Sequence, residues 1–183
     1  MRRKAILRWG AALICAVLLC ACAAPVVSPA PSAAAPEPTV PPVPGERLSF
    51  EAKYYRTDGF VEGIAYPQVT TIQSPQEAQA YVDANKEVYS LNPNRAEIFT
   101  KALLGFDDAY FQDHVIIVVM LEEPSGSIRH LVTAVVQTDD RTRVLIRRDV
   151  PEPQTADMAQ WHILLELSRE GYQGNKAAAS TYD

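Results

Sequence analysis

The sequence predicts an α+β protein with a mostly antiparallel sheet of about six to seven strands and two helices packed on one face. Residues 48–55 alternate apolar and polar side chains with a period of two, which is typical of a half-buried strand. Residues 74–106 contain two helix-start signals, each followed by apolar residues at helical spacing. Residues 115–167 contain further apolar runs separated by turn residues. Strands on both sides of a helical pair favour the α+β class.

Both predicted helices begin with a capping pattern. In Ser74-Pro75-Gln76-Glu77, serine is the cap, proline takes the first helical position, and glutamate completes a capping box. Residues 94–97 repeat this pattern. The second helix then presents an apolar stripe and ends at Gly105, a residue common at helix C-termini. The stripe consists of Ile98, Phe99, Ala102, Leu103 and Phe106.

Short strands are predicted at 48–55, 60–65 and 69–73, before the helices. The seven apolar residues Val115–Leu121 (VIIVVML) indicate a central strand covered on both faces. Turn residues at 124–126 and 139–141 predict that the chain from 115 to 150 forms an antiparallel meander of three strands. A last strand is predicted at 161–167, and the tail beyond it is mostly polar and small.

The first 21 residues have the features of an export signal. They contain four basic residues and no acid, and the stretch from Trp9 to Ala21 is apolar. This run is shorter than the roughly 20 residues that a transmembrane helix needs. Without the signal, 13 basic residues face 22 acidic ones, a net charge near −9. Such a chain lacks the basic surface that nucleic-acid binding requires, so we expect no nucleic-acid partner.

All three cysteines, Cys15, Cys20 and Cys22, lie near the end of this signal. Cys22 follows Leu19-Cys20-Ala21, an aliphatic residue and two small ones, and this stretch resembles the bacterial lipobox. The resemblance implies that Cys22 carries a diacylglycerol thioether and becomes the mature N-terminus, and two acyl chains suffice for stable anchoring. The implied partner is the lipid bilayer, and the implied location is the extracytoplasmic face of the cell membrane. The alternative is an ordinary secretory signal cleaved at an A-x-A-like site such as 21–23.

Cleavage before Cys22 would leave a single cysteine, so the mature chain would contain no internal disulfide. Residues 23–45 contain eight prolines among alanine and small polar residues, a composition that favours an extended polyproline II conformation. The predicted organisation is therefore a signal peptide at 1–21, an acylated cysteine with its tether at 22–45, and a single α+β domain at 46–183. The domain has 138 residues, enough for one core.

The segment from Phe106 to Ser168 has a recognisable order of elements. An acidic-aromatic stretch (FDDAYFQDH) precedes the buried strand, a glycine turn (SGSIRH), a hairpin and a final strand (QWHILLEL). This order resembles that of lipoproteins of Gram-positive anaerobes whose domain has no assigned biochemistry. It is also similar in layout to the C-terminal domain of the protease-complex subunit PrcB, although Ser125-Gly126-Ser127 replaces that family's paired glycines. The resemblance implies the topology and a non-catalytic, protein-associating role, and it implies no catalytic residue.

No histidine has metal-ligand spacing with another ligand on one helix, so the sequence predicts no metal site and no cofactor. The rival to a binding function is a small envelope hydrolase that uses His130 and His162 with a carboxylate such as Asp157 or Glu166. Ser127 lies three residues before His130 and suggests a nucleophile with its base. Residues three apart in a strand point to opposite faces, however, which disfavours that pair.

The remaining candidates form a possible binding face. Equal spacing parity places Arg143 and Arg147 on one face of the predicted sheet, where Arg129 could join them to bind an anionic wall polymer, a carboxylated ligand or an acidic patch. The alternative is a solvated face paired with nearby acids. Trp161 has the parity of core residues, and exposure would instead make it part of an interaction patch. The candidate residues are Arg129, His130, Arg143, Arg147, Trp161 and His162. The leading hypothesis is a lipid-anchored, non-catalytic domain that binds an envelope protein or wall component.

Overall fold

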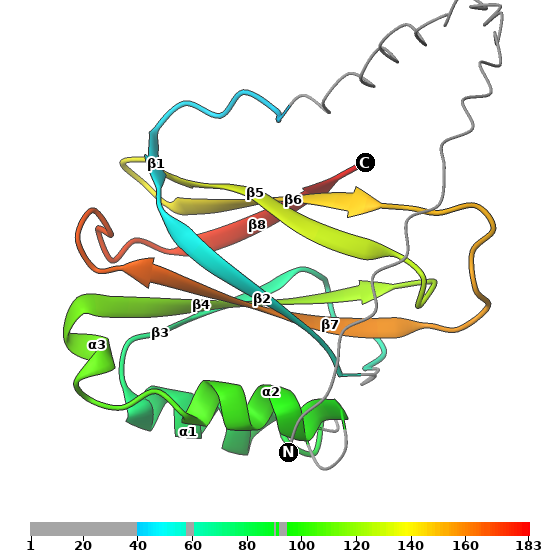
Figure 1. The fold of residues 1–183 in the computed structure, drawn as a ribbon, viewed down its shortest axis with the longest axis horizontal. Helices are drawn as coiled ribbons and strands as arrows, with labels where there is room; N and C mark the ends of the chain where they lie inside the picture. The colour runs from blue at the N-terminus through cyan, green and yellow to red at the C-terminus, as the bar shows by residue number, and fades with distance from the viewer. Residues whose placement is uncertain (1–39, 58–60, 90, 92–94) are drawn as a thin grey trace, which may run out of the picture. The chain divides into compact units, whose positions relative to one another are not determined.

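The computed structural model describes residues 40–57, 61–89, 91 and 95–183 (Figure 1). The predicted signal peptide, the lipobox with Cys22 and most of the tether lie outside the described residues. Contacts divide the chain into Met1–Pro38 and Thr39–Asp183, and the fold below is that of the second unit. Within the described ranges, no helix is both long enough and apolar enough to span a membrane.

In the described residues, eight strands form two four-stranded sheets, with helices outside the second sheet (Figure 1). Sheet A has the order β1 (Glu46–Leu48), β5 (Arg129–Gln137), β6 (Thr142–Asp149) and β8 (Ala177–Tyr182). Sheet B has the order β2 (Phe50–Arg56), β7 (Ala159–Ser168), β4 (His114–Glu123) and β3 (Gln68–Ile72). Among the strand pairs that the structure describes, β6–β8 is the one parallel pair and the others are antiparallel. The predicted α+β class is confirmed, with one or two more strands than expected and two sheets in place of one.

The predicted three-stranded meander is wrong, because β4 and β5 belong to different sheets. β4 pairs with β3 and β7, whereas β5 pairs with β1 and β6, so the turn at 124–128 carries the chain from sheet B to sheet A. The physical reason is that β4 is apolar on both faces and needs cover on both. The β5–β6 hairpin supplies one cover and the helices supply the other. The predicted 60–65 strand is wrong in its described part, because residues 61–65 contain a turn at Glu62-Gly63 and no strand.

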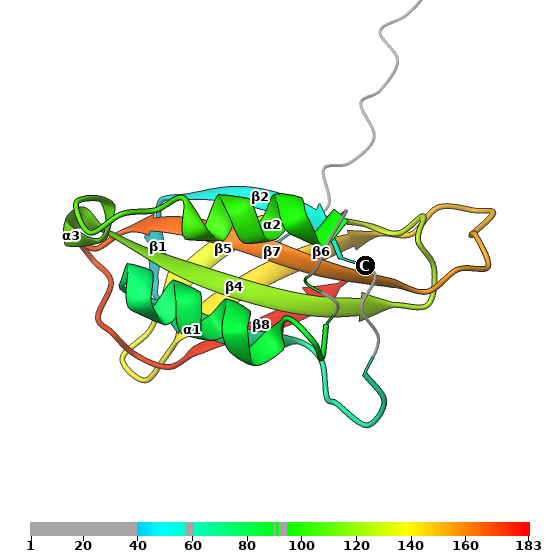
Figure 2. The same ribbon diagram turned by 90° about the horizontal axis from the view of Figure 1, so that it is seen from below.

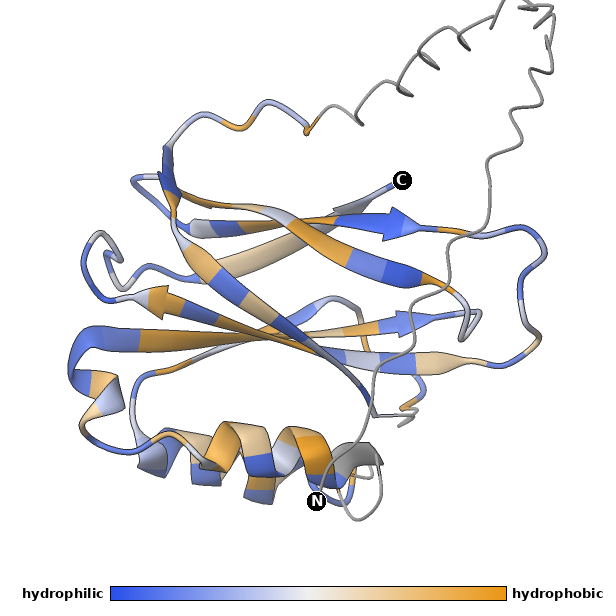
Figure 3. Ribbon diagram, viewed as in Figure 1, coloured by the Kyte–Doolittle hydropathy of each residue, from blue (hydrophilic) through white to orange (hydrophobic). Residues whose placement is uncertain are grey.

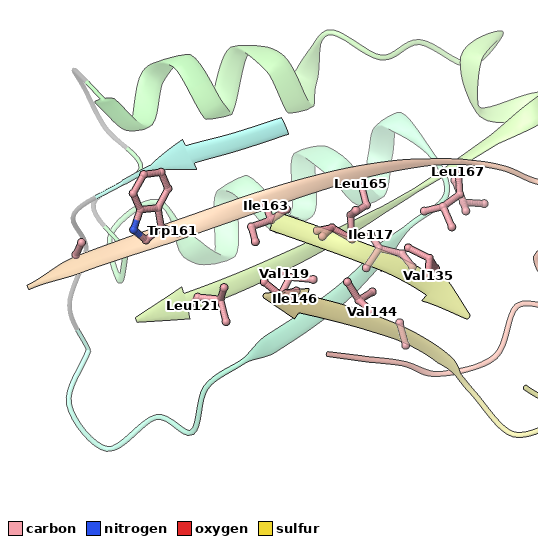
Figure 4. Packing of buried hydrophobic residues seen from close by; sticks show 14 residues of the cluster. Ile117, Val119, Leu121, Val135, Val144, Ile146, Trp161, Ile163, Leu165 and Leu167 are labelled. Carbon is pink, nitrogen blue, oxygen red and sulfur yellow. The ribbon is translucent and has the colours of Figure 1, made fainter. Parts of the chain in front are cut away.

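The main core fills the space between the two sheets (Figure 4). Alternate residues of β4 and β7, including Ile117 and Ile163, meet Val144 and Ile146 of β6 there. The intervening β4 residues face the helices and join a second cluster with Phe99. Figure 3 shows the resulting concentration of hydrophobic residues along β4 and β7. Both strands are therefore buried on two faces, as the unbroken apolar run of β4 predicted.

The helices α1 (Pro75–Asn85) and α2 (Arg95–Leu104) lie side by side on the outer face of sheet B (Figure 2). The predicted capping box of α1 is present. The Ser74 hydroxyl accepts a hydrogen bond from the Glu77 backbone N–H at 3.1 Å, and the Glu77 carboxylate accepts one from the Gln73 N–H at 2.7 Å. α2 ends just before Gly105 as predicted, while its Asn94 cap lies outside the described residues. A single turn, α3 (Tyr110–Asp113), leads into β4.

The chain enters the fold across the outer face of sheet A. Val40 and Val43 pack against an apolar strip on that face, formed by Ala134, Val136 and Leu145. At Gly45 the backbone has a φ of +135°, and a Cβ there would collide with the Gln137 carbonyl oxygen, so only glycine fits this close approach. β1 then joins sheet A and β2 joins sheet B after Ser49, so consecutive strands link the two sheets.

Candidate functional site

Two loops meet at one end of the sheets, at the right of Figure 1. They are the turn at 124–128 and the loop at 150–158, both of which connect the two sheets, and we call this region the loop end. The Gly126 N–H donates to the Asp157 carbonyl oxygen at 2.7 Å and lies 3.3 Å from its Oδ1. A Cβ at Gly126 would collide with the Asp157 carboxylate and the Arg56 guanidinium. The glycine predicted as a turn residue therefore allows the two loops to pack against each other.

The Asp157 carboxylate holds the exposed loop in place. Its Oδ2 accepts a hydrogen bond from Arg56 Nη2 at 2.7 Å, and the Thr155 and Ser125 hydroxyls lie 3.0 Å apart. Hydrogen bonds from Thr155, Arg56 and the Gly126 backbone lower the pKa of Asp157 to about 2. The carboxylate is therefore ionised at neutral pH. Residues 151–158 are all exposed, so this is a solvent-facing loop with a fixed conformation.

Arg129 and Trp161 pack together beside this loop. The Arg129 guanidinium lies 5.5 Å from the centroid of the Trp161 ring, and it donates to the Gly126 carbonyl at 2.7 Å. Trp161 is 9% exposed and belongs to the core between the sheets, which confirms its predicted core position. Met158 nearby in the chain is 52% exposed. The loop end thus combines a partly exposed cation, an aromatic ring and an exposed thioether.

A buried ionic cluster lies between the sheets near this end. His130 Nε2 is 2.8 Å from Glu123 Oε1, and Arg148 donates from Nε and Nη2 to the two Glu123 oxygens at 2.9 and 2.7 Å. The His130 side chain is fully buried, and Glu123 is 3% exposed. Burial acts to raise the pKa of Glu123, but hydrogen bonds from His130 and Arg148 together lower it below its usual value. Neither Glu123 nor Arg148 was identified as a candidate from the sequence, and only the packing of the two sheets brings them together.

His162 lies on the opposite face of sheet B, beneath the helices. Its ring is fully buried and its centroid is 4.4 Å from that of Phe99. Its Nδ1 is 2.7 Å from the Thr57 hydroxyl oxygen, and burial lowers the pKa of its imidazole to about 3. A buried imidazole with so low a pKa is a weak base at neutral pH. The hydroxyl of Thr57, itself 4% exposed, is therefore poorly placed to act as a nucleophile.

The structure does not bring His130 and His162 together. His130 faces the core between the sheets, where its ring is 5.6 Å from Trp161, whereas His162 faces the helices. The carboxylates considered for a hydrolase have other partners: Asp157 binds Arg56, and Glu166 accepts from Lys53 at 2.6 Å and from Tyr110 at 2.8 Å. In the described part of the chain, no group of three or more histidine, cysteine or acidic side chains is arranged to hold a metal ion.

Ser127 is engaged with the loop end. Its hydroxyl is 2.8 Å from that of Ser125 and accepts from the Thr155 N–H at 3.4 Å, while His130 Nε2 is bonded to Glu123. Ser127 therefore acts as a turn residue of the connection between the two sheets, and the disfavoured nucleophile–base pair with His130 is not formed. Its hydrogen bonds contribute to the fixed conformation of the 150–158 loop.

The arginines of the predicted face occupy two places. Arg143 and Arg147 lie on the outer face of sheet A, two residues on either side of Leu145, whose side chain packs in that face's apolar strip. Arg129 pairs with Asp149, so the strand register places it on the outer face of sheet A as well. Its guanidinium, however, lies over the Trp161 ring at the loop end. The six candidate residues are thus divided between the outer face of sheet A (Arg143 and Arg147), the loop end (Arg129 with Trp161), the space between the sheets (His130) and the helix-covered face of sheet B (His162).

These observations define an α+β domain of two packed sheets with helices on one outer face and an ordered loop end. Comparison of the chain with protein-family models, curated proteins and solved structures found no match. The function proposed below therefore depends on the residues themselves.

Proposed function

We propose that the protein is a lipoprotein held at the extracytoplasmic face of the cell membrane through diacylated Cys22. The observation that supports anchoring is the Leu19-Cys20-Ala21-Cys22 stretch after a short basic and apolar segment. The proline-rich residues after Cys22 fit a spacer between the lipid and the domain.

Replacement of the anchoring cysteine tests this proposal. The Cys22→Ala chain is expected to leave the membrane fraction, because the thioether cannot form. Immunoblotting of membrane and soluble fractions measures this, and Cys20→Ala is the matched control because alanine also suits the lipobox position. If the Cys22→Ala chain stays with the membrane as the wild type does, lipid anchoring through this residue is wrong.

We further propose that the domain is a non-catalytic binding module that uses the loop end to contact an envelope protein. The observation that carries this proposal is the eight-residue exposed segment at 151–158, which Thr155 and Asp157 hold in one conformation. An exposed loop that is already ordered loses less conformational entropy on binding. Arginine side chains are also enriched where interfaces gain most of their energy, and the exposed Arg129 lies beside the loop, packed over the buried Trp161 ring.

Two further points favour binding over hydrolysis. The imidazoles of His130 and His162 lie on opposite faces of sheet B, so the hydrolase hypothesis lacks its converging groups. The resemblance in layout to the PrcB C-terminal domain also supports an associating role. We therefore propose a protein partner in the envelope.

Site-specific photo-crosslinking in cells tests the binding surface. A photoreactive amino acid at Gln154 or Met158 is expected to yield a discrete crosslinked species, because both residues lie on the exposed loop. The matched control is Ile98, which is 63% exposed on α2 at the other side of sheet B. A species of the same size and yield from position 98, or none from positions 154 and 158, would contradict a partner site at the loop end. Gel mobility and mass spectrometry provide the measurement.

A further inference from the structure

The outer face of sheet A carries arginines that have no acidic partner. Arg47 and Arg143 are both register partners of Val136, so the three residues form one row across β1, β5 and β6. Arg147 pairs with Leu131 two rows further along. Residues directly opposite in neighbouring strands share a face. Among the described residues, none of these three arginines takes part in an ion pair or a side-chain hydrogen bond.

The apolar part of this face lies between the arginines. Leu131, beside Arg147, is 45% exposed, and the strip centred on Leu145 is covered by Val40 and Val43. Among the described residues of sheet A, Asp149 is the one acidic residue that the strand register places on this face. The face therefore presents three guanidinium groups and an exposed leucine on a protein whose overall charge is strongly negative.

The N-terminal end of the domain lies on this same face, on the side of the chain that contains Cys22. The described part of the domain begins at Val40, which packs on this face together with Val43. Val40 is the eighteenth residue after Cys22 in the sequence, a distance of at most about 55 Å in a polyproline II conformation. A lipid anchor on Cys22 would therefore keep the arginines within reach of phospholipid headgroups at a high effective concentration.

We infer that the outer face of sheet A docks on the anionic phospholipid surface in which Cys22 is anchored. This inference rests on the proposed lipid anchoring. Each arginine near an anionic bilayer contributes about 1 kcal/mol, which is a factor of about five in the contact equilibrium. The acidic remainder of the domain is repelled by the same surface, so the electric field favours one orientation. The loop end extends from one end of the sheets and stays accessible in that orientation.

The mature chain supplies its own probes. Cys22 is its single thiol and can be coupled to a maleimide lipid in vesicles, which reproduces a thioether anchor without the cell's acylation. Trp161 is its single tryptophan and packs between the sheets, about one 10 Å sheet spacing behind the arginines. Energy transfer from Trp161 to a dansyl-labelled headgroup therefore reports contact between this face and the bilayer.

On phosphatidylglycerol vesicles, the wild-type chain is expected to show strong transfer that falls in 0.5 M salt, and on phosphatidylcholine vesicles it is expected to show weak transfer. Arg143→Gln with Arg147→Gln should shift the contact equilibrium about 25-fold towards release. The matched control, Lys86→Gln with Lys101→Gln, removes the same charge from the helices and should keep the wild-type transfer. The inference would be overturned by weak transfer for the wild type on phosphatidylglycerol, or by equal transfer for the wild type and the arginine variant. A loss of transfer in the lysine variant as large as that in the arginine variant would also overturn it. Because the coupling is chemical, these outcomes are independent of the Cys22→Ala fractionation result.

Discussion

Lowering the pH from 7 to 5 is expected to reduce the free energy of unfolding by about 2 kcal/mol through His162 alone. In the folded protein the pKa of this buried imidazole is about 3, against a usual value of 6.5. The unfolded chain therefore binds a proton below pH 6.5 that the folded protein does not bind. The contribution to stability is complete above pH 6.5 and is lost as the pH falls from 6.5 towards 3. The slope is about 1.4 kcal/mol per pH unit.

The variant His162→Asn separates this effect from other titrations. Asparagine keeps a polar group near the position of Nδ1, where it can pair with the Thr57 hydroxyl, but it does not titrate. Urea unfolding at several pH values should show a lower stability at pH 7 and a much flatter dependence between pH 6.5 and 4. The matched control is Thr57→Val, which removes the hydroxyl partner but keeps the buried imidazole, and it should keep the wild-type slope because burial is what lowers the pKa of His162. An unchanged slope in His162→Asn would show that this imidazole is not the group responsible.

The second large effect is expected at the buried ionic cluster. Arg148→Met should lower the free energy of unfolding by about 3 kcal/mol, because it leaves the Glu123 carboxylate buried without its main cation. This estimate is at the low end for broken buried pairs because the Arg148 side chain is 24% exposed. The measurement is urea unfolding at pH 7, with the slope against urea checked for constancy.

Two further variants give this prediction its controls. Adding Glu123→Gln to Arg148→Met should recover part of the lost stability, because glutamine removes the unpaired charge and can still bond to His130. Arg143→Met removes an exposed arginine from the opposite face of the same strand and should change stability by less than about 0.5 kcal/mol. If Arg148→Met costs no more than Arg143→Met, the cluster does not stabilise the packing of the two sheets.

The sequence predicted those elements whose signals are local. The capping box at Ser74 and Glu77 depends on atoms within four residues, and the helix formed as expected. The seven apolar residues of β4 also gave the correct prediction of a strand buried on both faces. Which sheet each strand joins was not predictable in this way, because an alternating pattern is the same in either sheet. β8 was missed because its sequence, AAASTY, contains no run of large apolar residues. Its parallel pairing with β6 is a contact between distant parts of the chain, which the local pattern does not indicate.

The candidate site shows the same division. The parity of Trp161 placed it correctly in the core, since that inference uses only neighbours in its own strand. The burial of His162 depends on Phe99, which is 63 residues away in the sequence. The polar character of histidine alone therefore gave no indication that this side chain is buried. Glu123 and Arg148 each look like surface charges, and only the packing of sheet B against sheet A pairs them. Contacts between residues so far apart in the sequence cannot be predicted from the pattern of neighbouring residues.

The entry of the chain across sheet A determines how the domain bears mechanical load. A pull on the proposed lipid anchor would reach the domain first at Val40 and Val43, which are held by side-chain packing, and next at β1, which pairs over three residues with β5. These contacts would peel one after another before the seven residue pairs between β2 and β7 carry any tension. The domain therefore has a short extensible segment at its attachment point. Drag on a bound partner would lengthen this segment and leave sheet B, with its helices, intact.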